Sequence, residues 1–145
     1  IGLERDTNKG IISTNPENHQ KMVLTRQAKI DQVANQIPLL EVQGNQESDT
    51  LLVGWGSTEG HLHAAANELG CALAHFNYIN PLPKNTAAVL KKYKKVVVAE
   101  QNMGQFAGYL RMKIDGFCPM QFNQVKGQPF VVEELIEAFT KMMEA

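Results

Sequence analysis

Residues 51–60 read Leu51-Leu52-Val53-Gly54-Trp55-Gly56-Ser57-Thr58-Glu59-Gly60, an apolar run followed by a glycine-rich stretch. We expect a buried strand that passes through a tight turn into a helix, with Gly54, Gly56 and Gly60 as the structural glycines of the turn. A strand, turn and helix in this order present backbone N–H groups at the carboxyl edge of an α/β sheet, where such folds bind ligands or partners. This stretch therefore predicts an α/β fold.

Apolar runs and amphipathic segments alternate along the rest of the chain. We expect strands at 50–53, 71–76, 96–99 and 117–125, and helices at 15–37, 62–69, 86–92, 103–110 and 132–143. The segment 96–99 is apolar throughout, which is typical of a parallel strand buried on both faces, whereas Pro119 indicates an edge strand or a bent one. The alternation predicts a three-layer α/β/α sandwich with a mainly parallel sheet.

The first segments of the chain are polar. Residues 1–14 hold few apolar anchors and are interpreted as an arm or linker, and 43–50 as a second connector. Asn15 is a helix cap and Pro16 suits the first turn, so the folded domain is expected to span 15–145, with Pro38 ending its first helix. Because the sequence opens at Ile1, we expect a piece of something longer.

Composition excludes several classes of function. The chain has 145 residues and 43% hydrophobic content, which suits one domain with a sizeable core. Its net charge of −1 gives no electrostatic case for binding nucleic acid or an anionic membrane. No apolar run approaches the roughly 20 residues of a membrane helix, so we expect a cytoplasmic protein. Cys71 and Cys118 fit no metal spacing and are interpreted as buried thiols.

The glycine turn is close to a dinucleotide-binding fingerprint, with the pattern G-x-G-x-x-x-G at 54–60. That fingerprint also requires an acidic residue about 20 positions later to hold a ribose, and 74–80 contains neither an acid nor an arginine. A nucleotide- or flavin-binding module that uses Gly54–Gly60 is therefore kept as an alternative. The stretch is not the elbow of a hydrolase around Ser57, because Trp55 and Glu59 occupy its glycine positions. Ser57 or Thr58 is expected to cap the helix.

No catalytic, cofactor-binding or metal-binding residues are assigned from spacing. His61 and His63 lie two apart on a presumed helix and point to different faces, and His19 and His75 are isolated. Asn102 and Gln105 resemble a capping box. Glu100 ends the most buried strand at the carboxyl edge of the sheet. The candidate interface or site is therefore this edge, with the residues Trp55, Ser57, Glu100, Asn102 and Gln105.

Several short motifs occur together in a fixed order. They are Gly2-Leu3-Glu4 with Asp6 and Gly10; Pro16-Glu17-Asn18-His19 with Lys21, Met22 and Arg26; 52–58; Pro81-Leu82-Pro83; and Glu100 with Asn102, Gly104 and Gln105. In these residues the chain resembles the α subunit of the 2-oxoacid:ferredoxin oxidoreductases, specifically its C-terminal, transketolase-C-like domain.

The resemblance implies an oxidoreductase complex that uses thiamine diphosphate with Mg²⁺ and 4Fe–4S clusters. Such a complex converts a 2-oxoacid, coenzyme A and oxidised ferredoxin into acyl-CoA, CO₂ and reduced ferredoxin, and we favour 2-oxoglutarate as the substrate. The resemblance also implies that the cofactors lie outside this chain, between a missing N-terminal domain of α, to which 1–14 would lead, and the β subunit. Two cysteines are too few to ligate a 4Fe–4S cluster. The isolated chain is then expected to be inactive, an assembly domain whose partners are those two parts and, as an open alternative, a second copy.

Overall fold

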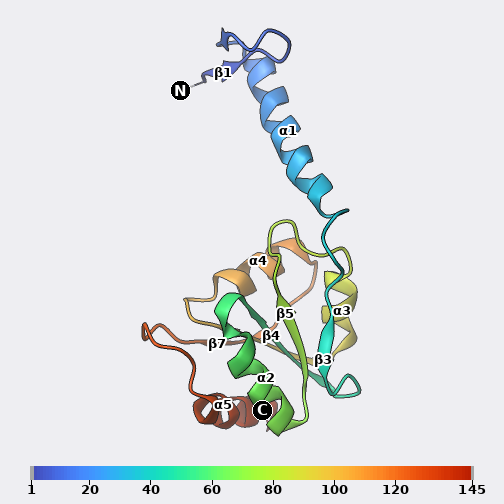
Figure 1. Ribbon diagram of the computed structural model, residues 1–145, viewed down its shortest axis with the longest axis vertical. Helices are drawn as coiled ribbons and strands as arrows, with labels where there is room; N and C mark the ends of the chain where they lie inside the picture. Colours follow the sequence, from blue (N-terminus) through green and yellow to red (C-terminus); the bar gives the residue numbers. More distant parts are fainter. Residues whose placement is uncertain (1, 145) are drawn as a thin grey trace.

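A five-stranded sheet forms the centre of the computed structural model, which describes residues 2–144 (Figure 1). The strand order is β3-β5-β4-β6-β7. The parallel strands are β4 (Thr50–Trp55), β5 (Ala72–Phe76), β6 (Lys95–Glu100) and β7 (Met120–Asn123), and β3 (Val42–Gly44) pairs antiparallel with β5. The mainly parallel sheet is confirmed, and so is the edge position of the strand that follows Pro119.

Helices cover both faces of this sheet. Two of them, α2 (Glu59–Leu69) and α5 (Val132–Glu144), pack on one face, and α3 (Thr86–Lys92) and α4 (Gln105–Lys113) pack on the other. Alternate residues of β4 enter the two cores, so that Leu51 belongs to the core that contains Phe106 and Leu52 to the core that contains Phe139. Each fully buried leucine contributes about 1.5–3 kcal/mol. The predicted three-layer sandwich is confirmed.

Two glycines are required where β4 turns into α2. A Cβ atom at Gly54 would lie 2.8 Å from Thr58 Oγ1 and would overlap the Leu62 side chain, so helix and strand approach closely here. Gly56 has a φ of +65°, a left-handed conformation that other residues adopt at a cost. Gly60, the third predicted turn glycine, lies in the first turn of α2 with open space around it.

The first 44 residues differ from the prediction. The supposed arm contains a hairpin of β1 (Glu4–Arg5) and β2 (Ile12–Ser13), the supposed connector at 43–50 begins within β3, and α1 (Pro16–Val33) ends before residue 37. Strands of two or three residues are too short for an alternating pattern to reveal. Three turn-forming residues, 34–36, end α1 well before Pro38.

The hairpin packs on the start of α1 through polar contacts. Arg26 forms a 2.7 Å ion pair with Glu4, and the Asn18 side-chain amide donates to the Arg5 carbonyl at 2.8 Å. At the helix start, Asn15 accepts a hydrogen bond from the Asn18 backbone N–H at 2.7 Å, and Pro16 is the first helical residue, as predicted. The N-terminal motif residues of the resemblance thus hold one small unit together.

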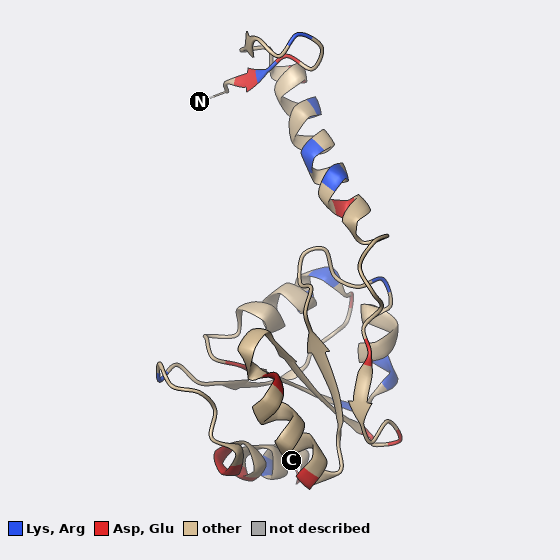
Figure 2. Cartoon of the chain, in the orientation of Figure 1, with Lys and Arg blue, Asp and Glu red and all other residues tan. Residues whose placement is uncertain are grey.

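Helix α1 and its hairpin project away from the sheet and its covering helices (Figure 1). None of the residues of α1 is buried, and the apolar side chains of Val23, Ile30 and Val33 are 40–46% exposed. Figure 2 shows basic residues recurring along α1 and both signs of charge spread over the rest of the chain. Between residues 2 and 144, no helix is long and apolar enough to span a bilayer.

Candidate functional site at the carboxyl edge of the sheet

The structure brings the five predicted edge residues together around Trp55, the last residue of β4. Trp55 lines a hollow of about 260 Å³ together with Ser57 and Asn102. It also lines a second hollow, of about 290 Å³, together with Gln105. Glu100 lies beneath them, at the end of the neighbouring strand β6. The predicted grouping at this edge is therefore present.

Glu100 is turned into the protein, with only 1% of its surface exposed. Its carboxylate accepts hydrogen bonds from the backbone N–H groups of Phe106 and Ala107, each at 2.8 Å, at the N-terminus of α4. It also accepts from the Asn102 side chain at 2.9 Å and from the Trp55 indole at 3.3 Å. A negative charge is favoured at a helix N-terminus. The structure therefore favours an internal, structural role for Glu100 over contact with a partner.

Asn102 lies two residues before the N-cap of α4, which is Gly104. Its side-chain oxygen accepts from the backbone N–H groups of Gly104 at 2.7 Å and Gln105 at 3.0 Å. The predicted capping box is therefore wrong, because Gln105 is the first helical residue and not the third, although Asn102 does bond the helix start. Together with Glu100, it accounts for the backbone donors of residues 104–107 and fixes the loop between β6 and α4.

Thr58 occupies the N-cap position of α2, as predicted, but its side chain does not make the expected hydrogen bond to a backbone N–H of the helix. Thr58 precedes the helix, yet its hydroxyl donates back to the Trp55 carbonyl at 2.9 Å. The cause is the 3-10 turn Gly56–Thr58, which gives Thr58 a helical backbone where a capping residue is usually extended. Ser57 is exposed on the surface of this turn.

The larger hollow beside Trp55 is lined by aromatic and apolar side chains. The Trp55 and Phe106 ring centroids are 6.1 Å apart, and those of Phe106 and Tyr109 are 6.4 Å apart. The Tyr109 hydroxyl donates to the Asn80 side chain at 3.2 Å across its rim. An aromatic hollow with a polar rim is suited to receive an apolar side chain from another protein.

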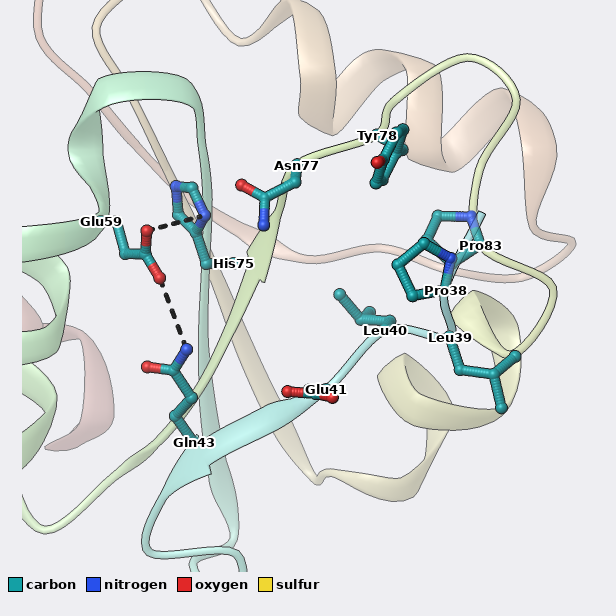
Figure 3. A pocket seen from close by; sticks show the side chains of 10 residues that line it. All are labelled: Pro38, Leu39, Leu40, Glu41, Gln43, Glu59, His75, Asn77, Tyr78 and Pro83. Atoms are coloured by element: carbon teal, nitrogen blue, oxygen red, sulfur yellow. Dashed lines mark hydrogen bonds and ion pairs between the residues drawn. The ribbon is translucent and has the colours of Figure 1, made fainter. Parts of the chain in front are cut away.

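A further cavity, of about 190 Å³, lies where the segment after α1 meets the N-terminus of α2 (Figure 3). His75, on β5, faces it with a side chain that is 2% exposed, and Nδ1 lies 3.8 Å from a carboxylate oxygen of Glu59. Gln43 donates to the other Glu59 oxygen at 3.4 Å. Sequence reasoning treated His75 as isolated, because nothing local to it indicates that Glu59 lies nearby.

The described residues, 2–144, contain no group of three or more His, Cys, Asp or Glu side chains that could hold a metal ion. The prediction of two buried thiols is correct for Cys71 and wrong for Cys118, which is exposed. Burial raises the pKa of the Cys71 thiol, which makes it a poor nucleophile at neutral pH.

The known proteins that are similar to this chain are of the kind that the sequence motifs indicate. No family model matches the chain. The chain is 42% identical over 142 residues to the 2-oxoglutarate oxidoreductase subunit KorA of Mycobacterium tuberculosis, a match that covers 92% of this chain and 21% of that protein. It is 27% identical over 140 residues to the α subunit of 2-oxoacid:ferredoxin oxidoreductase 1 of Aeropyrum pernix, covering 88% of this chain and 22% of that protein.

A solved structure has the same fold. It is the 2-oxoglutarate:ferredoxin oxidoreductase from Magnetococcus marinus with 2-oxoglutarate, coenzyme A and succinyl-CoA bound, which matches with a TM-score of 0.83 and 26% identity. The match covers 94% of this chain and 25% of that one. The resemblance to the α subunits of these oxidoreductases is confirmed over nearly all of the chain, which spans about a fifth of the length of its curated relatives.

Proposed function

We propose that the chain is the C-terminal, transketolase-C-like domain of the α subunit of a thiamine-dependent 2-oxoacid:ferredoxin oxidoreductase. The complex would convert a 2-oxoacid, coenzyme A and oxidised ferredoxin into acyl-CoA, CO₂ and reduced ferredoxin. The observation that carries the proposal is the 42% identity to a 2-oxoglutarate oxidoreductase subunit across 92% of the chain. The name of that relative also supports 2-oxoglutarate as the substrate.

Within this enzyme, the domain would serve assembly and not the chemical steps. A 4Fe–4S cluster needs four ligands, usually cysteines, and the chain has two. The cluster therefore does not fit this chain. We assign it, together with thiamine diphosphate and its Mg²⁺, to the β subunit and the N-terminal part of α.

The edge around Trp55 is the surface we assign to this assembly. Its indole is half-buried between two hollows and is held in place by Glu100. Rigid aromatic side chains beside a pocket are typical of the centres of protein interfaces. The partners that would cover it are the β subunit and the N-terminal domain of the same α subunit.

One observation favours a second candidate, a nucleotide- or flavin-binding module. The smaller hollow is bordered by Gly56, Ser57 and Thr58 at the start of α2, where phosphate groups bind in other α/β folds. Its volume of about 260 Å³ lies below the roughly 300–1,000 Å³ typical of ligand pockets. A rise in melting temperature with ATP, FMN or coenzyme A, but not with inorganic phosphate, would favour this candidate.

The main proposal is tested by activity in two preparations. The purified chain is compared with the same sequence joined to the N-terminal part of a relative's α subunit and co-expressed with the β subunit. We expect 2-oxoglutarate-dependent reduction of ferredoxin or a viologen dye in the second preparation only. Dye reduction by the chain alone would contradict the assembly role.

A further inference from the structure

The cavity beside His75 is too small for a cofactor. Its volume of about 190 Å³ lies below the roughly 300–1,000 Å³ of pockets that hold drug-sized ligands. Figure 3 shows that it lies between Glu59 and His75 at one end and Tyr78 with Pro38 and Pro83 at the other. Its size suits one long side chain with a polar end.

The polar end of this cavity has an unmet capacity for hydrogen bonds. Neither ring nitrogen of His75 has a hydrogen-bond partner within the protein, although the side chain is 2% exposed. The 3.8 Å from Nδ1 to Glu59 is longer than a hydrogen bond. Buried polar groups in folded proteins are normally paired, so His75 points to a bound group that supplies or aligns a partner.

The charges of the lining select the sign of that group. Two carboxylates, of Glu41 and Glu59, border the cavity, and no lysine or arginine does. Gln43 occupies one oxygen of Glu59, but a carboxylate offers about four acceptor positions. The cavity therefore presents acceptors and negative charge, which a cationic donor would complement.

We propose that this cavity is a socket for an arginine side chain that another protein segment of the enzyme inserts. A planar guanidinium has five N–H donors and can bond the Glu59 carboxylate, which is 49% exposed and lies 3.8 Å from the buried Nδ1 of His75. Pro38 and Pro83 supply an apolar wall for its methylene stem. The insertion by a partner segment rests on the proposed function, since it names the chemistry by which the rest of the complex docks on this domain.

The test uses the chain as it exists and three blocked amino acids. Nα-acetylargininamide, its uncharged isostere Nα-acetylcitrullinamide, and Nα-acetyllysinamide are titrated while the ring NMR signals of His75 are followed. We expect a saturable shift with the arginine probe, and binding at least ten-fold weaker with citrulline and lysine. Glu59→Gln should weaken the arginine probe about ten-fold or more, whereas Glu68→Gln, an exposed carboxylate on the same helix, should leave binding unchanged.

Equal shifts with arginine and citrulline, an absence of shift with arginine, or tighter binding of lysine would overturn the socket. Melting curves of both variants separate a loss of binding from a loss of fold. Because no partner subunit takes part in the titration, its failure is distinct from a failure of the proposed function. The converse result is also distinguishable. If the cavity binds the arginine probe but the chain does not assemble into an oxidoreductase, the proposed assembly role is refuted and the socket is not.

Discussion

The indole N–H of Trp55 donates to the carboxylate of Glu100 over 3.3 Å, which joins the ends of β4 and β6 across the carboxyl edge of the sheet. The same carboxylate accepts from the backbone N–H groups of Phe106 and Ala107 in the first turn of α4. One buried charge thus fixes both the aromatic ring on the surface and the helix behind it. The two residues, which sequence reasoning grouped together as interface candidates, have different roles, and substitutions should separate them.

We expect Glu100→Ala to destabilise the fold. It leaves four donors without their acceptor, among them the Phe106 and Ala107 backbone N–H groups. The expected loss is about 3 kcal/mol in the free energy of unfolding and roughly 10 °C in melting temperature. Urea denaturation measures this loss in the free energy of unfolding.

The control is Glu133→Ala, which removes an exposed carboxylate from the first turn of α5. It should change the free energy of unfolding by less than about 0.5 kcal/mol. Equal stability of the two variants would show that Glu100 is dispensable to the fold.

The glycine turn should respond position by position. Gly54→Ala would force a methyl group against Leu62 and should cost about 1–3 kcal/mol. Gly56→Ala should cost about 1 kcal/mol because of its positive φ, and Gly56→Val should cost more because Val is β-branched. Gly60→Ala should stabilise the protein by about 0.5 kcal/mol, since the space there is open and alanine favours the helix. In thermal melts, Gly60→Ala should be the most stable of the four, followed by Gly56→Ala, with Gly54→Ala and Gly56→Val the least stable. An unchanged melting temperature in Gly54→Ala would refute the close approach of α2.

The parts of the fold that the sequence predicted are those whose local pattern is long enough. Strands β4, β5 and β6 are runs of five or six largely apolar residues, and their positions were predicted to within two residues at each end. Strand β3 has three residues and β1 two, so no alternation distinguishes them from a connector. The strand character of β3 comes from pairing with a distant strand, as in Val42 with Ala74, and that of β1 comes from its hairpin with β2.

The candidate sites show the same limit: features that depend on a local pattern were predicted, and features that depend on long-range packing were not. Trp55, Glu100 and Asn102 could be placed at one edge because all follow strands expected to run parallel. The inward orientation of Glu100 depends on how α4 approaches β6, which the sequence does not give. The pairing of Glu59 with His75 depends on the register that sets Gly54 opposite His75, and no pattern within either segment reveals that register.

The contact between the hairpin and α1 should weaken at low pH. The backbone N–H of Arg5 and then the guanidinium of Arg26 lower the pKa of Glu4 from its ordinary 4.5. A carboxyl whose pKa is lowered by folding stabilises the structure above its unfolded pKa, and this contribution is lost as the pH falls through the folded pKa. We therefore expect the hairpin to be held less firmly on α1 as the pH falls below 4.5, observed by NMR as weaker contacts between Asn18 and Arg5.

The variant Arg26→Gln provides the test of cause. It should raise the pKa of Glu4 toward 4.5 and move the weakening of the contact to higher pH. Lys21→Gln removes the same charge from an exposed position on α1 and should leave the Glu4 titration unchanged. If both variants shift the Glu4 pKa equally, the pKa of Glu4 is lowered by the overall positive charge of α1 and not by the ion pair with Arg26.

Trp55→Ala should weaken assembly without unfolding the domain. The substitution removes the aromatic surface between the two hollows, while Glu100 keeps its backbone donors and Asn102. Loss of one interface anchor of about 1.4 kcal/mol corresponds to a ten-fold weaker complex with the proposed partners, the β subunit and the N-terminal part of α. Titration of the labelled β subunit measures this affinity.

Two control variants test the cause. Trp55→Phe retains most of the apolar surface and should lose much less affinity. Met112→Ala removes a 72% exposed apolar side chain from α4, outside both hollows, and should have no effect. If Trp55→Ala assembles as tightly as Met112→Ala, the carboxyl edge is ordinary surface, and the contact with the rest of the enzyme must lie elsewhere, with the exposed stripe of α1 as the next surface to test.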